Sequence, residues 1–264
     1  MLKVQNLHKV FNRGTVNEKV VFSGLNLKVE KGQFITIIGS NGAGKSTLLN
    51  VIAGLIKADS GSIEIEGRDI CGMPEHKCSR LIGRVFQDPS KGTAPNMTIL
   101  ENLSMAYNKG KTYGLTAGVN KKNLPVFNEM LSELNLGLED KLHTKVGLLS
   151  GGQRQALSLL MAIMDKPRLL LLDEHTAALD PKTSERINEI TQNIISEHSI
   201  TTLMVTHNMN HAIKMGDRLL MMNEGNIILD MQGEQKKNLT VNKLLSHFDK
   251  LQSKDVLSDR MLFA

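Results

Sequence analysis

The sequence has few cysteines, few aromatic residues and no long apolar run. It contains two cysteines, Cys71 and Cys78, among 264 residues. With no second cysteine pair or clustered histidines nearby, they cannot form a disulfide framework or complete a zinc site, so we expect free thiols. No segment approaches the roughly 20 apolar residues that cross a bilayer, and the start lacks the features of a signal peptide. We therefore expect a globular, cytosolic chain.

Positive charge is modest and scattered. Lysine and arginine number 32 against 27 aspartates and glutamates, a formal net charge of +5. Adjacent lysines occur only at 121–122 and 236–237, and tryptophan is absent. Proteins that bind single-stranded nucleic acid combine basic grooves with aromatic rings. The composition therefore favours anionic ligands or a membrane surface over nucleic acid.

Apolar residues are numerous enough to fill a core, and their spacing indicates an α/β fold. They make up 41% of the chain. Residues 25–29 and 62–66 alternate apolar and polar side chains, which is typical of half-buried antiparallel strands. The run FITII at 34–38 indicates a buried strand. A glycine-rich turn follows it, and then a helical pattern at 45–55.

A helical insertion is predicted in the middle of the chain. From about residue 90 to 145, short helical segments at 98–106 and 124–136 alternate with connections rich in glycine, lysine and asparagine. No strong strand pattern occurs there. We expect a helical subdomain at about 88–164, inserted within one domain that spans 1–264, because no linker marks a second domain.

The α/β pattern returns after this insertion. Residues 168–174 and 201–207 resemble buried strands, and 217–233 resembles a hairpin with an Asn-Glu-Gly-Asn turn. Residues 180–198 form an amphipathic helical pattern, which Asp180 caps and Pro181 starts. A short helix, on the surface or packed back, is expected at 241–251.

A phosphate-binding motif lies between the first buried strand and the helix after it. The pattern is Gly39, four residues, then Gly44, Lys45 and Ser46. The glycines let successive backbone N–H groups face a phosphate, and the helix N-terminus adds its dipole. Lys45 would reach the β and γ oxygens, and Ser46 would ligate Mg²⁺. The predicted nucleotide-binding residues here are Gly39, Ser40, Asn41, Gly42, Ala43, Gly44, Lys45, Ser46 and Thr47.

Two acids end the strand predicted at 168–174. Asp173 closes this strand and Glu174 follows it. Hydrolysis of a nucleoside triphosphate requires a carboxylate for the metal's water shell and a group that positions the attacking water. The pair therefore predicts Asp173 beside the metal and Glu174 as the catalytic carboxylate.

A second anion-binding candidate occurs at LSGGQ, residues 149–153. Ser150 and the amides of Gly151 and Gly152 would begin a helix, with Gln153 in its first turn. One chain cannot easily fold both cradles onto one phosphate. Two chains arranged head to tail can place each triphosphate between the first loop of one and LSGGQ of the other. The motif thus predicts a homodimer.

Together these motifs resemble those of the ATP-binding cassette (ABC) ATPases, the nucleotide-binding subunits of transporters. The resemblance covers essentially the whole chain and implies ATP and Mg²⁺ as ligands. It implies that Phe11 stacks on adenine, with Phe22 the weaker candidate. It further implies that Gln87 contacts Mg²⁺ and the attacking water, that Asp180 ends a loop at the dimer interface, and that His207 contacts the γ-phosphate and orients Glu174.

The sequence departs from the family pattern in two places. His175 replaces the proline that most members have after the glutamate, and we interpret it as a subgroup mark instead of a second catalytic base. The segment before LSGGQ, KVGLL, lacks the acid or amide that many exporters carry there. This departure favours an importer over an exporter.

These features predict an ATP-hydrolysing subunit of a membrane importer for a small solute, an amino acid or similar. Its expected partners are permease subunits and, through them, an extracytoplasmic solute-binding protein, with no nucleic acid. It would lie peripherally at the cytoplasmic face of the membrane. An exporter subunit, a soluble ABC ATPase acting on DNA or ribosomes, and a regulator without turnover remain alternatives.

Overall fold

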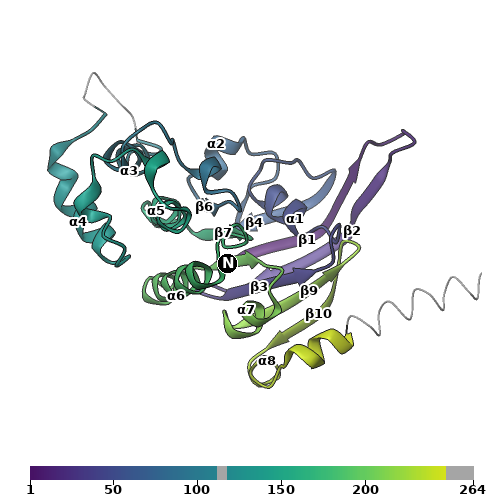
Figure 1. Ribbon diagram of the computed structural model, residues 1–264. Helices are drawn as coiled ribbons and strands as arrows, with labels where there is room; N and C mark the ends of the chain where they lie inside the picture. Colours follow the sequence, from purple (N-terminus) through teal and green to yellow (C-terminus); the bar gives the residue numbers. More distant parts are fainter. Residues whose placement is uncertain (112–117, 248–264) are drawn as a thin grey trace, which may run out of the picture.

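The computed structural model describes residues 1–111 and 118–247 and contains two β-sheets with helices around them (Figure 1). The first sheet is antiparallel and has the order β2-β1-β4-β5. Its strands are β1 (Leu2–Phe11), β2 (Lys19–Val29), β4 (Ser60–Ile65) and β5 (Arg68–Asp69). Buried and exposed residues alternate at 25–29 of β2, and buried and partly exposed residues alternate at 62–65 of β4, so the predicted half-buried strands are confirmed.

The second sheet has six strands in the order β10-β9-β3-β8-β7-β6. They are β3 (Phe34–Gly39), β6 (Ile82–Val85), β7 (Leu169–Asp173), β8 (Thr202–Val205), β9 (Arg218–Asn223) and β10 (Asn226–Gln232). Neighbours pair in parallel from β6 to β9, whereas β10 pairs antiparallel with β9. The turn between them has Glu224 and Gly225 at positive φ, as a tight hairpin requires. The expected strands and hairpin are confirmed.

The six-stranded sheet is covered on both faces, which is why its central strands are continuous apolar runs. In β7, Leu169 and Leu171 pack with the antiparallel sheet and α1 (Lys45–Ile52). Leu170 and Leu172 pack on the opposite face with the helical insertion and α6 (Pro181–Glu197). All four leucines are fully buried, and each contributes roughly 2 kcal/mol through burial.

The segment between β6 and β7 is helical, as expected (Figure 1). Its helices and short 3₁₀ turns pack on one another and on α6 through a shared core. In its described part, residues 86–111 and 118–168, it contributes no strand to either sheet. Residues 112–117 of the predicted subdomain lie outside the described residues. The elements are η1 (Pro89–Gly92), α3 (Ile99–Tyr107), η2 (Lys121–Asn123), α4 (Leu124–Ser132), η3 (Glu139–Lys141), η4 (Val146–Leu148) and α5 (Gly151–Ile163).

The remaining helices complete the fold. α2 (Glu75–Cys78) precedes β6, α7 (Met209–Lys214) precedes β9, and α8 (Glu234–Lys237) follows β10. Residues 241–247 are helical and pack back, since Leu244 is fully buried beside the six-stranded sheet; the rest of the predicted helix, 248–251, lies outside the described part. None of the helices described has the length and apolar content that a membrane crossing requires. Both cysteines are free thiols, as expected.

Candidate functional site

The glycine-rich loop joins β3 to α1 at the carboxyl edge of the parallel sheet. Gly39 and Gly44 have φ values of 155° and 96°. A Cβ on Gly39 would lie 2.2 Å from the carbonyl oxygen of Met222, and one on Gly44 would lie 2.9 Å from the Phe22 ring. Both the backbone conformation and the space therefore require glycine at these two positions. The predicted sequence of strand, loop and helix is confirmed.

Lys45 lies inside this loop. It is 5% exposed, and its Nζ donates hydrogen bonds to the carbonyls of Gly39 and Ser40, each at 2.8 Å. Burial lowers the pKa of Lys45, whereas the nearby Glu174 and Asp173 raise it. The loop thus holds a cation beside the N-terminus of α1, which is the electrostatic environment that a phosphate group requires.

Asp173 meets the loop at the end of β7. The Ser46 hydroxyl donates to Asp173 Oδ1 at 3.2 Å. Hydroxyl and carboxylate oxygens are ligands suited to Mg²⁺, so this pair fits the metal expected there. The sequence did not point to Arg84 on β6, whose Nη2 lies 3.6 Å from Asp173 Oδ2 and 2.6 Å from the side-chain oxygen of Asn50. Only folding brings β6 and β7 side by side, so no local motif marks this arginine.

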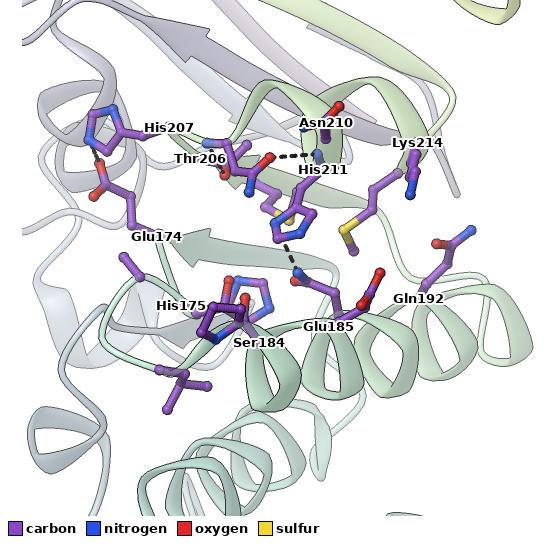
Figure 2. Close-up of a pocket in the computed structure, with 18 of the residues that line it drawn as sticks. Glu174, His175, Ser184, Glu185, Gln192, Thr206, His207, Asn210, His211 and Lys214 are labelled. Carbon is purple, nitrogen blue, oxygen red and sulfur yellow. Dashed lines mark hydrogen bonds and ion pairs between the residues drawn. The ribbon is translucent and has the colours of Figure 1, made fainter.

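Glu174 and His207 contact each other across the ends of β7 and β8. The distance from Glu174 Oε1 to His207 Nε2 is 2.5 Å (Figure 2). Glu174 has a φ of 49°, a left-handed conformation that costs roughly 1–2 kcal/mol for a residue with a side chain. Its N–H donates to the carbonyl of Val205 at 2.9 Å, which ties it to β8. The structure therefore brings together the two side chains that the sequence placed 33 positions apart.

A pocket of about 300 Å³ connects these groups. It contains Phe11 from the end of β1, Lys19 and Val21 from β2, the loop residues 41–47, Glu174 and His207. Phe11 is partly exposed at this pocket, whereas Phe22 is 1% exposed and its ring packs on Gly44. Only an accessible ring can stack on a base, so the geometry favours Phe11 over Phe22. Lys19, a second cation in the pocket, was missed because no motif contains it.

The LSGGQ segment begins α5, away from this pocket. Ser150 caps the helix: its Oγ accepts from the N–H of Gln153 at 3.2 Å, and the Gln153 side chain accepts from the N–H of Ser150 at 3.3 Å. Gly151 is exposed, and Gly152 packs against Thr183, where a Cβ would lie 2.3 Å from Thr183 Cγ2. The residues from Ser150 to Gln153 are not among the described residues that line the pocket at the glycine-rich loop. The two cradles are separate within one chain.

Two further predicted site residues lie at the ends of elements. Asp180 caps α6 by accepting from the N–H of Thr183 at 3.1 Å, and Pro181 is the first residue of the helix, as expected. Gln87 is exposed just after β6 and is not one of the described residues that line the pocket. The carbonyl of its neighbour Phe86 accepts from the side chain of Gln155 on α5, at 3.2 Å. The backbone next to Gln87 thus adjoins the helical insertion.

His175 is a buried residue. It is 2% exposed, and its Nε2 lies 3.2 Å from Thr191 Oγ1 on α6. Burial, together with the nearby His211, lowers the pKa of His175 from 6.5 to about 4. The ring is therefore neutral at pH 7, and its low pKa and its burial make it a weak base that solvent hardly reaches, which fits the interpretation that it is not a second catalytic base.

The buried imidazole predicts a pH-dependent stability. Because unfolding restores the ordinary pKa near 6.5, the unfolded chain binds a proton more readily, so stability is lost as the pH falls from 6.5 towards 4. Between pH 7 and pH 5 we expect the free energy of unfolding of the wild type to fall by about 2 kcal/mol more than that of His175→Gln. Urea unfolding of both proteins, in EDTA and without nucleotide, measures this difference. An equal fall in the free energy of unfolding of the two proteins between pH 7 and pH 5 would contradict a buried neutral His175.

Comparison with known proteins places this site in a family. The family described as ABC transporter matches residues 22–177. The tyrosine transport ATP-binding protein of Clostridioides difficile (strain R20291) is 49% identical over 249 residues, which cover 94% of this chain and 99% of that protein. The spermidine/putrescine import ATP-binding protein PotA of Spiroplasma citri is 36% identical over 86% of this chain and 60% of its own length.

Solved structures of ATP-binding cassettes resemble this chain as well. A post-hydrolysis dimer of the ATP-binding cassette MJ0796 bound to ADP and Pi has a TM-score of 0.74 and 29% identity, and it covers 88% of this chain and 98% of that chain. The ADP conformation of the cassette MJ1267 has a TM-score of 0.78 and 29% identity, covering 94% and 98%. The chain therefore belongs to the ABC transporter family, as an ATP-binding subunit that couples ATP hydrolysis to transport.

Proposed function

We propose that Glu174 is the general base of ATP hydrolysis and that His207 holds it in place. The observation that carries this proposal is the 2.5 Å contact between Glu174 Oε1 and His207 Nε2 beside the loop that holds Lys45. Glu174 is 13% exposed and His207 48% exposed, so a water molecule can reach the carboxylate from the pocket. Glu174 accepts the proton of the attacking water. Lys45 and His207 stabilise the charge that develops on the γ-phosphate.

Ser46 and Asp173 are the residues that would hold Mg²⁺, with Gln87 as a third ligand from the end of β6. When bound, Mg²⁺ supplies positive charge that neutralises the phosphate oxygens. Arg84 orients the Asp173 carboxylate on the side opposite Ser46, since the two oxygens of Asp173 face different partners. Phe11 stacks on the adenine, and the backbone amides of residues 39–47 bind the phosphates.

A head-to-tail homodimer completes each site. Ser150, Gly151 and Gly152 are not among the described residues that line the chain's own pocket. Their position at the start of α5 supports a role in binding the γ-phosphate held by a second copy. The related cassette MJ0796, bound to ADP and Pi, is dimeric. Asp180 caps α6 near the LSGGQ segment, because its neighbours on either side contact the glycines: Leu179 lies against Gly151 and Thr183 against Gly152. We place the loop before Asp180 at the dimer interface.

A groove of about 440 Å³ between the helical insertion and the segments around α1, α2 and β6 is the proposed docking site for a cytoplasmic segment of a permease. Phe86, next to Gln87, lines this groove together with residues of α3 and α5. Two of its apolar side chains are unusually exposed, Leu55 at 43% and Met105 at 47%. Apolar exposure of this kind, beside a residue of the hydrolysis site, fits a partner helix whose position depends on nucleotide.

Met105→Glu is expected to weaken the association with the permease at least about tenfold, because it places a charge in an apolar contact. Co-purification of the tagged chain with membrane proteins measures the loss, and ATP binding should be unchanged. Val126→Glu is the matched control, since Val126 is 42% exposed on α4 and does not line the groove. If Met105→Glu co-purifies with as much permease as Val126→Glu does, the groove is not the docking site of the permease.

The transported solute is proposed to be an amino acid or a similar small solute that enters the cell. This proposal rests on the 49% identity with a tyrosine transport ATP-binding protein over nearly the whole of both chains. The similarity to PotA, which is named as an import ATP-binding protein, supports import as the direction of transport. A relative named as the ATP-binding protein LolD of a lipoprotein-releasing system, 33% identical over 86% of this chain, is the reason to keep the opposite direction as the alternative.

Purification of the tagged protein from detergent-solubilised membranes, followed by mass spectrometry, tests the assembly. We expect a polytopic permease and an extracytoplasmic solute-binding protein, with this chain peripheral on the cytoplasmic face. Recovery with a permease but no binding protein would favour export. Recovery only with ribosomes or DNA would contradict the transporter assembly and leave the hydrolysis site intact.

A further inference from the structure

Helix α6 carries three buried polar residues, and two of them, Asn188 and Thr191, contact histidines. They are 7% and 0% exposed, although the helix packs through apolar residues on the same side. Their spacing of three places both on one face of the helix. Buried polar groups are retained where they have a hydrogen-bonding partner, and each of these two contacts an imidazole, one in the loop after β7 and the other in α7.

The first pair is Thr191 and His175. The Thr191 hydroxyl donates to the carbonyl of Ile187 at 2.7 Å, which uses its single proton. At the 3.2 Å contact, Thr191 Oγ1 is therefore the acceptor and His175 Nε2–H is the donor. This hydrogen bond assigns the tautomer of His175. It also attaches the residue that directly follows Glu174 to the middle of α6.

The second pair is Asn188 and His211. Asn188 Nδ2 donates to His211 Nδ1 at 3.1 Å. His211 lies in α7, which begins two residues after His207 and is capped by Asn208. The Asn188 amide thus attaches the short helix behind His207 to α6, one helical turn from the attachment of His175. Burial lowers the pKa of His211, Glu185 on α6 raises it, and Lys214 on α7 lowers it further.

A cavity lies beside these attachments. The space between α6 and the loops that carry Glu174 and His207 has a volume of about 990 Å³, and its lining includes both catalytic side chains, His175 and His211 (Figure 2). Side chains do not fill this space, so packing alone does not confine the two loops on that side. The strained, left-handed backbone of Glu174 also requires support from its neighbours.

We propose that α6 is the common support that sets Glu174 against His207, and that His175 is a positioning residue that acts through Thr191. This inference rests on the proposed roles of Glu174 and His207 and adds the residues that hold them together. His175 is 2% exposed and is not one of the described residues that line the pocket at the glycine-rich loop, so its role is to position and not to react. It fixes where the Glu174 carboxylate lies, and a displacement of about 1 Å at a reacting group can lower a rate about a hundredfold.

His175→Leu and Thr191→Val remove the two ends of the hydrogen bond separately. Each is expected to lower kcat for ATP hydrolysis about 10- to 100-fold, with KM for ATP changed less than about threefold. The double variant should be no slower than the slower single variant, because both remove one interaction. His175→Gln places an amide N–H where Nε2–H lies and should retain kcat within about threefold, as should Thr191→Ser.

The controls separate positioning from folding and from the proposed chemistry. His198→Leu makes the same substitution at the exposed end of α6 and should leave kcat unchanged. Long-range ¹H–¹⁵N spectra of the nucleotide-free full chain should show His175 as the Nε2–H tautomer, and Thr191→Val should shift the signals of both His175 and His207. Glu174→Gln is measured in the same assay.

The outcomes are distinguishable. If Glu174→Gln is inactive and His175→Leu and Thr191→Val keep wild-type kcat, the positioning role is wrong and the catalytic role of Glu174 stands. If His175→Gln falls as far as His175→Leu, the hydrogen bond is not what positions Glu174. If Glu174→Gln turns over normally, the proposed base is wrong, and the histidine tautomer still tests the contact with Thr191.

Discussion

Glu174→Gln is expected to bind ATP with an affinity near that of the wild type and to hydrolyse it about 10²- to 10⁴-fold more slowly. The amide has nearly the same shape as the carboxylate, and it can still contact His207 Nε2. It cannot accept a proton from water. ATP binding without turnover should also hold the homodimer closed, so the dimer should accumulate in ATP and Mg²⁺.

Steady-state ATPase assays and size-exclusion chromatography with and without ATP measure these two effects. Glu185→Gln is the matched control, because Glu185 lies on α6 in the adjoining cavity and does not line the pocket at the glycine-rich loop. Turnover at the wild-type rate in Glu174→Gln would exclude Glu174 as the base. Loss of ATP binding would show instead that the substitution disrupts the pocket.

Ser150→Arg is expected to abolish hydrolysis in the homodimer, although the residue lies outside the chain's own nucleotide pocket. The reason is that arginine at the cap of α5 would occupy the space that the γ-phosphate bound by the second copy requires. A mixture with Lys45→Ala should restore activity. In a mixed dimer, the intact glycine-rich loop of one chain faces the intact LSGGQ of the other, so one of two sites is complete.

With equal amounts of the two inactive chains and random pairing, the mixture should recover about a quarter of wild-type activity, because half of the dimers carry one working site each. Each variant alone is the negative control, and thermal unfolding checks that both are folded. No recovery from any mixing ratio would contradict the shared site. Activity in Ser150→Arg alone would remove Ser150 from the site.

Much of the site was predictable because it consists of short local motifs. The turn from β3 to α1 requires glycine at Gly39 and Gly44, so its pattern is visible in the sequence. The cap of α6 by Asp180 and the hairpin around Gly225 depend in the same way on neighbouring residues. Local rules of backbone conformation decide these features, and the structure confirms them.

Other parts depend on residues that are distant in the sequence. Arg84 reaches Asp173 only because β6 and β7 pair in parallel. Lys19 joins the pocket only because β2 passes beside the glycine-rich loop. Neither residue belongs to a motif, so neither could be identified from its neighbours. The choice between Phe11 and Phe22 likewise depended on which ring the core buries.

The sequence by itself determined the α/β class, the glycine-rich loop and the acids at the end of β7, because periodicity and spacing along the chain specify them. The motifs also carried the resemblance to the family that the comparisons show. The tertiary structure alone decided that His175 donates to Thr191, that Asn188 binds His211, and that the two loops carrying Glu174 and His207 share α6 as their support. The physical reason is that a side-chain hydrogen bond depends on distance and direction in space, and these are set by how β7, β8, α6 and α7 pack together.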